Sequence, residues 1–149
     1  MTVSAARAAE YERVLARAAA WAARESGVVG ALLVGSFARD EATVDSDVDV
    51  VILTDRADAY REATDWISEA TGENAPVVRS QYWGPLLERR VRLASGLEVE
   101  FGFVAPSWAE IDPLDEGTAG VVARGVRTLY DPNGVVSRLA IAVSRRGPA

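Results

Sequence analysis

The stretch from residue 34 to residue 53, VGSFARDEATVDSDVDVVIL, limits most strongly what this chain can fold into. Its first residue closes an apolar run, after which Gly35-Ser36 breaks the pattern. Ten residues separate the serine from Asp47, and Asp47 and Asp49 open a second apolar run. Apolar runs of strand length, bounded by Gly and Ser, predict two buried strands. Because side chains alternate along a strand, the two aspartates share one face of the second strand.

The two aspartates are unfavourable together unless a cation lies beside them. Carboxylates at positions i and i+2 of a strand lie within about 7 Å of each other, and partial burial increases their repulsion. A hard divalent cation removes that repulsion and takes carboxylate oxygens as ligands. Asp47 and Asp49 therefore predict a metal site, and the alternative is a solvated turn that leads into a core strand.

Gly35 and Ser36 follow the first strand and precede residues 37–41, which are expected to form a short helix. Backbone N–H groups at the start of a helix, with a hydroxyl group beside them, bind anions. Glycine also lets a phosphate approach the backbone closely. Taken alone, the pair is an ordinary turn. Together with the aspartates it supplies a phosphate cradle and a metal site, which are the requirements of phosphoryl or nucleotidyl transfer.

The composition excludes several other kinds of site. The chain contains no Cys and no His, and every basic side chain is Arg. Thiolate and imidazole metal sites, His general bases and lysine nucleophiles are therefore excluded, and any metal is held by oxygen, as Mg²⁺, Mn²⁺ or Ca²⁺ are. A net charge of −6 argues against a nucleic-acid partner, which needs a basic face. No apolar stretch is long enough for a membrane span and no signal-peptide pattern is present, so we expect no membrane partner and a cytoplasmic location.

The rest of the chain predicts an α/β (α+β) fold, with a mixed β-sheet flanked by helices. With 149 residues, of which 49% are apolar, the chain is expected to form one domain over residues 1–149. Residues 94–96, Ala-Ser-Gly, are expected to connect a hairpin, because Gly in the last loop position adopts the left-handed conformation. We expect helices at residues 4–26, 57–71, 116–124 and 133–143, and strands at residues 28–34, 47–53, 77–83, 89–93, 97–104 and 126–130.

The second strand of the hairpin, GLEVEFGFV, supplies a third carboxylate. Glu98, Glu100 and Gly102 share one of its faces. The small Gly102 leaves room for a ligand beside Glu100, which we therefore choose over Glu98 as the third member of the site. The alternative is cross-strand pairing, since the hairpin register places Arg92 opposite Glu98 and Arg90 opposite Glu100.

Gly35-Ser36, the Asp47 and Asp49 pair and a later strand carboxylate resemble the nucleotidyltransferase superfamily typified by DNA polymerase β. The likeness is strongest to its small bacterial single-domain members, namely the minimal nucleotidyltransferases and the aminoglycoside and lincosamide nucleotidyltransferases. It is specific from residue 32 to residue 53 and extends through residue 104. The resemblance implies a polymerase β palm-like core and transfer of NMP from an NTP to a hydroxyl acceptor.

By the same resemblance, the glycine-serine turn would bind the nucleotide. Gly35 and Ser36, with their backbone, would hold the terminal phosphates of the NTP. Arg39, one turn after the serine, either reaches a phosphate or is a solvated surface arginine.

The resemblance also gives the carboxylates their roles. Asp47, Asp49 and Glu100 would be the catalytic residues and would ligate two Mg²⁺ ions, with Mn²⁺ as an alternative. Glu100 would also serve as the base for the acceptor hydroxyl, or help it. Many members have Asp where this chain has Glu, so the choice between Glu98 and Glu100 stays open on this ground.

Three functions remain open from the sequence. The first is an enzyme that transfers NMP to the hydroxyl group of a small molecule. The second is an antitoxin-like enzyme whose acceptor is a toxin-like partner protein. The third is a nucleotide-binding module without catalysis, which we rank last because all the motif residues are present. A homodimer also stays open.

Overall fold

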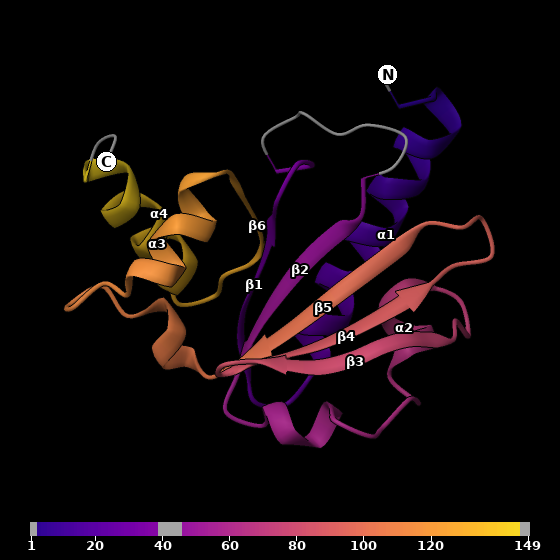
Figure 1. Ribbon diagram of the computed structural model, residues 1–149, viewed down its shortest axis with the longest axis horizontal. Helices are drawn as coiled ribbons and strands as arrows, with labels where there is room; N and C mark the ends of the chain where they lie inside the picture. Colours follow the sequence, from indigo (N-terminus) through magenta and orange to yellow (C-terminus); the bar gives the residue numbers. More distant parts are fainter. Residues whose placement is uncertain (1–2, 39–45, 147–149) are drawn as a thin grey trace.

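In the computed structural model, residues 3–38 and 46–146 are described, and they form a β-sheet with helices on both faces (Figure 1). The helices are α1 (Ala5–Arg24), α2 (Ile67–Thr71), α3 (Glu116–Ala123) and α4 (Val135–Arg145), with two 3₁₀ segments, η1 (Ala57–Tyr60) and η2 (Pro106–Ala109). The strands are β1 (Val28–Val34), β2 (Val48–Thr54), β3 (Val77–Trp83), β4 (Leu86–Arg92), β5 (Glu98–Val104) and β6 (Val126–Tyr130). None of the described helices has the length and apolar character that crossing a bilayer requires.

The sheet is mixed, as its strand order shows. The order across the sheet is β3-β4-β5-β2-β1-β6. β2 and β5 run parallel, and every other neighbouring pair in this order is antiparallel. This confirms the predicted mixed sheet flanked by helices. The parallel pair also brings together the two strands that carry candidate carboxylates, with Asp49 opposite Glu100.

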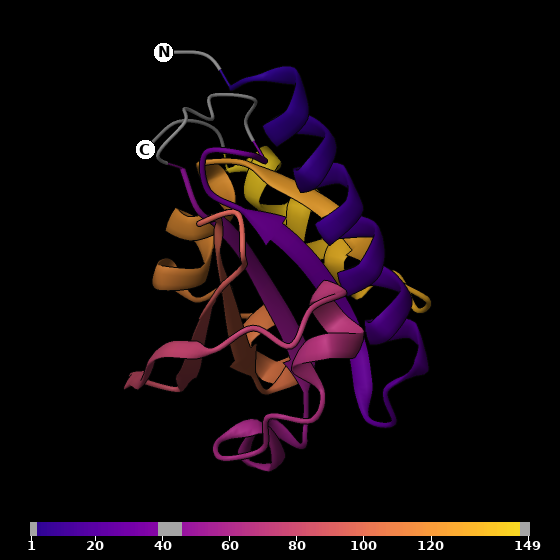
Figure 2. The ribbon, with the colours of Figure 1, turned by 90° about the vertical axis from the view of Figure 1, so that its right-hand side faces the viewer.

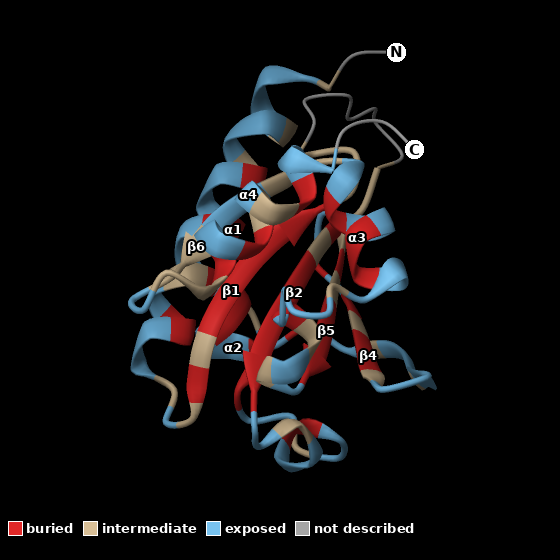
Figure 3. Cartoon of the chain, turned by 90° about the vertical axis from the view of Figure 1, so that its left-hand side faces the viewer, coloured by how far each residue is buried: buried red, intermediate tan, exposed pale blue. Residues whose placement is uncertain are grey.

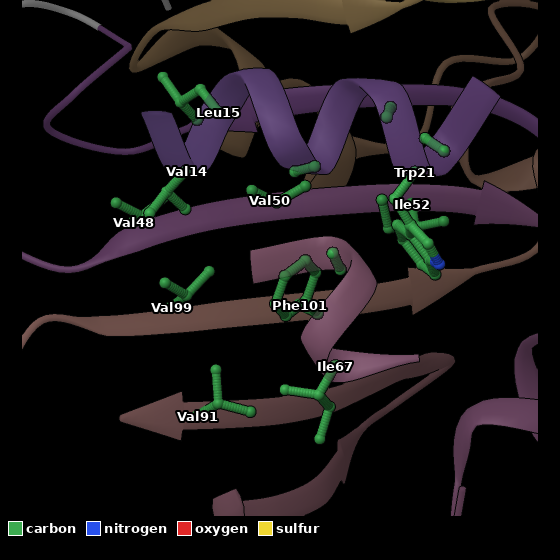
Figure 4. Close-up of a cluster of buried hydrophobic side chains, with 14 of the residues drawn as sticks. Val14, Leu15, Trp21, Val48, Val50, Ile52, Ile67, Val91, Val99 and Phe101 are labelled. Atoms are coloured by element: carbon green, nitrogen blue, oxygen red, sulfur yellow. The ribbon is translucent and has the colours of Figure 1, made fainter. Parts of the chain in front are cut away.

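One face of the sheet packs against α1, η1 and α2. Trp21 of α1 is fully buried there and meets the ring of Phe101 edge-on, with the ring centroids 6.2 Å apart. Val14 of α1 and Ile67 of α2 point into the same layer (Figure 4). Figure 2 shows α1 running along this side of the sheet. A continuous hydrophobic core therefore covers this face, which leaves the other face for a polar site.

The opposite face is covered by helices over only part of its width. α3, α4 and η2 pack there against β1 and β2, where Leu32, Leu53 and Leu139 are fully buried (Figure 3). Over β3, β4 and β5 the same face carries charged side chains instead, Arg90 and Glu100 among them. The boundary between the two halves runs along β2 and β5, and the candidate carboxylates lie at this boundary.

Several predicted elements are confirmed in place. β1, β3 and β6 have the predicted bounds, and α1, α3 and α4 lie close to their predicted positions. The hairpin register is also as predicted, with Arg92 opposite Glu98 and Arg90 opposite Glu100. Gly96, in the hairpin loop, has a φ of 93°, which is the left-handed conformation expected of it.

The predicted helix at residues 57–71 is wrong. The segment forms η1 at its start and α2 at its end, with non-helical backbone between them. The carbonyl groups of Arg61 and Ala63 accept hydrogen bonds from the guanidinium of Arg89, at 2.5 and 3.0 Å, instead of from helix amides. Arg89 is buried on β4, so a side chain distant in sequence overrides the local helical periodicity.

Candidate active site

Asp49 and Glu100 lie side by side on the partly open face of the sheet. They are direct partners in the parallel pairing of β2 with β5, and their carboxyl groups share a hydrogen bond. The residues next to each of them along its strand point into the core beneath α1, because side chains alternate along a strand. The structure therefore brings together two of the three predicted carboxylates.

Gly35 lies directly against Asp49. The backbone has a φ of 83° there, and a Cβ atom on residue 35 would lie 2.6 Å from Asp49 Oδ2. Both the backbone conformation and the space therefore require glycine. The turn continues through Ser36, and the N–H of Ala38 donates to the Gly35 carbonyl at 3.1 Å. The remainder of the predicted short helix, and Arg39 with it, lies outside the described residues.

Asp47 lies just before β2, and its carboxylate is bound to Arg90 of β4. Nη1 of this arginine donates to Asp47 Oδ2 at 2.5 Å and to Glu98 Oε1 at 3.3 Å. Nη2 lies 3.6 Å from Glu100 Oε1. One guanidinium therefore bridges three carboxyl groups, and the sequence indicates only the cross-strand part of this arrangement.

Glu98 lies nearer the hairpin loop than Glu100 does. Arg92 donates two hydrogen bonds to Glu98 Oε2, at 3.1 and 2.8 Å. These hydrogen bonds hold the pKa of Glu98 below its usual value. Glu98 therefore makes the cross-strand contact that the sequence offers as the alternative to a role in the site.

Glu88 of β4 also belongs to the group, although the sequence motif does not indicate it. Only 1% of Glu88 is exposed, and its carboxylate accepts hydrogen bonds from Arg79 Nη2 at 2.9 Å and Trp83 Nε1 at 3.1 Å. It also contacts Arg79 Nε and hydrogen-bonds to Glu100. The predicted strand begins one residue too late to include Glu88. Continuing the hairpin register places it opposite Gly102, and this is the signal that identifies it.

These charged side chains form one group on the open face, which we call the carboxylate–arginine cluster. Its carboxyl groups outnumber its guanidinium groups, so the cluster is acidic in total. Its members are Asp47, Asp49, Glu88, Glu98, Glu100, Arg79, Arg90 and Arg92.

Burial and mutual hydrogen bonding shift the protonation of the innermost carboxyl groups. Burial raises the pKa of Glu100 to about 9, and the hydrogen bonds with Glu88 and Asp49 act in the same direction. Burial also raises the pKa of Asp49. Burial acts likewise on Glu88, but hydrogen bonds from Arg79, Glu100 and Trp83 outweigh it and lower the pKa of Glu88 to about 2. Burial and the neighbouring carboxyl groups of Asp49 and Glu88 therefore favour the protonated form of Glu100.

A pocket of about 320 Å³ opens over Asp49 and Glu100. Its walls include the Gly35 turn, Trp83 at the end of β3 and Trp108 of η2. The sequence gives no functional signal for these tryptophans, because they belong to no motif and come together only through the fold. The pocket gives the two carboxyl groups access to a ligand.

Gly102 lines the same pocket as Glu100, which agrees with the space that the sequence predicts beside this glycine. A Cβ atom on residue 102 would lie 3.0 Å from Leu86 Cδ1, so Leu86 also occupies part of the space beside this glycine. Leu86 begins β4, earlier than the predicted strand, and its side chain lies on the same face as Glu100. Gly35, Leu86 and Gly102 all line the pocket over Glu100.

The sequence of the chain matches a known protein family. A family model described as a nucleotidyltransferase domain matches residues 18–91, which include Gly35, Asp47 and Asp49. The chain belongs to the polymerase β-type nucleotidyltransferase superfamily. Among solved structures, a chain of the Cid1 poly(U) polymerase is similar at 17% identity with a TM-score of 0.48. The match covers 68% of this chain and 32% of that one, so this chain spans about a third of its length. No curated protein sequence matches the chain.

The donor chemistry of this nucleotidyltransferase domain fits a hard divalent cation. Asp49 and Glu100 offer adjacent carboxyl oxygens, and the Gly35 turn lies against one of them. Within residues 3–38 and 46–146, however, no three acidic side chains are placed to hold a metal ion together. The contacts explain this, because Asp47 is bound to Arg90 and Glu88 is bound to Arg79.

Proposed function

We propose that this nucleotidyltransferase domain transfers NMP from an NTP to the hydroxyl group of a small molecule, with Mg²⁺ as its cofactor. The observation that carries the proposal is the contact between the Gly35 turn and the Asp49–Glu100 pair beneath a pocket. A tight glycine turn supports phosphate binding, and paired carboxylates support binding of the accompanying cation. Both requirements of nucleotidyl transfer are therefore supported at one place.

Each predicted site residue among the described residues has a role in the proposal. Gly35 and Ser36 hold the terminal phosphates of the NTP. Asp47, Asp49 and Glu100 hold the metal, which supplies positive charge for the phosphate oxygens.

Glu100 is also the proposed proton acceptor. Positive charge held beside Glu100 would favour its carboxylate form, because a nearby cation stabilises an ionised carboxyl group. Its carboxylate then takes the proton of the acceptor hydroxyl. The hydroxyl oxygen forms a bond to the α-phosphorus, and the bond from that phosphorus to pyrophosphate breaks.

The size and walls of the pocket favour a small acceptor. A cavity of about 320 Å³ is within the range of small-molecule sites, and aromatic side chains such as Trp83 and Trp108 supply apolar contact area there. The net charge of −6 disfavours a polynucleotide acceptor, which is itself strongly negative.

Labelling with radioactive nucleotides tests the proposal. The protein is incubated with Mg²⁺ and each α-³²P-labelled NTP, together with either the small-molecule fraction or the protein fraction of a cell extract. We expect label in the small-molecule fraction, and no label with EDTA or with Asp49→Asn. Label on a protein band would instead favour the antitoxin-like function, and no label in either fraction would contradict catalysis.

A further inference from the structure

We propose that Arg90 is a positioning residue that competes with the divalent cation for Asp47 and Glu100. The cation then gains Asp47 as a ligand only when the arginine releases it. This inference rests on the proposed function, because it concerns the same candidate metal ligands. It extends that function by giving a residue outside the motif control over metal affinity.

The contacts of Arg90 support this competition. Its side chain is 13% exposed and lies among three carboxyl groups, with oxygen atoms 2.5 Å away in Asp47, 3.3 Å in Glu98 and 3.6 Å in Glu100. Two of these three residues are candidate metal ligands. A guanidinium and a metal ion bind the same lone pairs of a carboxylate oxygen, so binding of one at Asp47 Oδ2 weakens binding of the other.

Electrostatic repulsion adds to the competition for lone pairs. A cation bound by Asp49 and Glu100 would lie close to a guanidinium that is 3.6 Å from Glu100 Oε1. Two positive charges at such a separation repel strongly in a partly buried site. Removing the charge at residue 90 therefore raises the affinity of the cluster for a divalent cation.

The surroundings of Arg90 also allow it to move away from Asp47. Its Nε atom is buried and has no hydrogen-bond partner within the part of the chain that the structure describes. Its Nη1 atom, which donates to Asp47, also donates to Glu98, so the guanidinium already has a second carboxylate partner when it releases the aspartate. When a cation replaces the Arg90 guanidinium at Asp47, both the aspartate and the arginine therefore keep a partner of opposite charge.

Arg92 is the matched control for Arg90. It lies two positions further along β4 on the same face and also contacts Glu98, at 2.8 Å. Its side chain is 54% exposed, and among the described residues it forms no ion pair with Asp47 or Glu100. Replacing Arg92 therefore removes a positive charge from the same strand without releasing a candidate metal ligand.

Titration with Mn²⁺ in the absence of nucleotide tests the inference without an activity readout. Electron paramagnetic resonance of free Mn²⁺ gives the dissociation constant for the full-length wild type, Arg90→Gln, Arg90→Lys and Arg92→Gln. We expect Arg90→Gln to bind Mn²⁺ about tenfold more tightly than wild type, since one charge-assisted hydrogen bond no longer has to be broken. Arg92→Gln is expected to bind like wild type. Arg90→Lys is expected to bind about threefold more tightly than wild type, because lysine lacks the planar fork.

The outcomes separate this inference from the proposed function. If wild type binds Mn²⁺ and a folded Arg90→Gln binds it equally or more weakly, the competition is refuted while the metal site stands. If Arg90→Gln does not fold, as circular dichroism would show, Arg90→Lys decides by the same criterion. If wild type binds no Mn²⁺, the proposed metal site fails and this inference fails with it.

Discussion

Replacing Gly35 by alanine tests whether the glycine turn and the carboxylate pair act as one site. The structure predicts two separate costs. The first is backbone strain, because residue 35 has a φ of 83° and an L-residue in the left-handed region costs about 1–2 kcal/mol. The second is a clash, because the added Cβ atom would lie 2.6 Å from Asp49 Oδ2, so the carboxylate has to move.

Gly96→Ala separates the two costs. Residue 96 has a φ of 93°, but no atom lies within 4 Å of the position that its Cβ would take. Gly96→Ala should therefore lose about 1–2 kcal/mol of unfolding free energy, which for a domain of this size lowers Tm by roughly 2–8 °C, and Gly35→Ala should lose at least as much. Only Gly35→Ala should disturb the site. A catalytic group displaced by about 1 Å can cost on the order of 100-fold in rate.

The assay is NMP transfer under saturating Mg²⁺, with Tm measured on the same preparations. We expect Gly96→Ala to keep the wild-type kcat/KM and Gly35→Ala to lose about 100-fold. Equal kcat/KM values for the two variants would refute the reasoning, since the contact with Asp49 would then have no bearing on function.

Three further predictions concern other residues. Glu100→Gln should lower kcat at least about tenfold, which is the low end for a lost proton acceptor, whereas Glu98→Gln should change kcat less than about twofold. If steady-state kinetics show the reverse order, Glu98 is the third carboxylate of the site instead. Although burial alone raises the pKa of Asp131, hydrogen bonds from the N–H groups of the first turn of α4 hold it below its usual value. A carboxyl group whose pKa is lower in the folded state stabilises the protein at pH values above its unfolded-state pKa. Asp131→Asn should therefore lower the unfolding free energy by about 0.5–1 kcal/mol at pH 7. In urea unfolding, this difference in free energy from wild type should vanish as the pH falls below about 4, and a pH-independent difference would contradict the prediction. Arg89→Gln should lower the unfolding free energy by about 1.5–3 kcal/mol in the same assay, because two backbone carbonyl groups lose a charged hydrogen-bond donor. An unchanged unfolding free energy would mean that water replaces the arginine.

Local patterns were sufficient to predict much of this fold. The apolar run that forms β1 and the three-residue loop that ends in Gly96 depend on nearby residues alone. The hairpin register followed from that loop, and it placed Arg90 and Glu100 opposite each other. Strand parity also placed Asp49 and Glu100 on polar faces, but only the parallel pairing of β2 with β5 brings them together.

The features that the sequence did not reveal depend on contacts between distant residues. Arg89 of β4 breaks the helical periodicity of the segment before α2 by donating to the carbonyl groups of Arg61 and Ala63. Leu86 of β4 occupies part of the space beside Gly102 of β5, and no local pattern around Gly102 indicates this contact. The bond between Arg90 and Asp47 joins residues 43 positions apart, and no spacing rule within one strand or hairpin indicates it.

A crystal structure with Mn²⁺ and a non-hydrolysable NTP tests the central claim most directly. The anomalous signal of Mn²⁺ marks the metal without relying on activity. We predict a peak coordinated by Asp49 and Glu100, with the triphosphate on the backbone of the Gly35-Ser36 turn. A triphosphate bound elsewhere, or a Mn²⁺ peak that contacts neither carboxylate, would contradict the account.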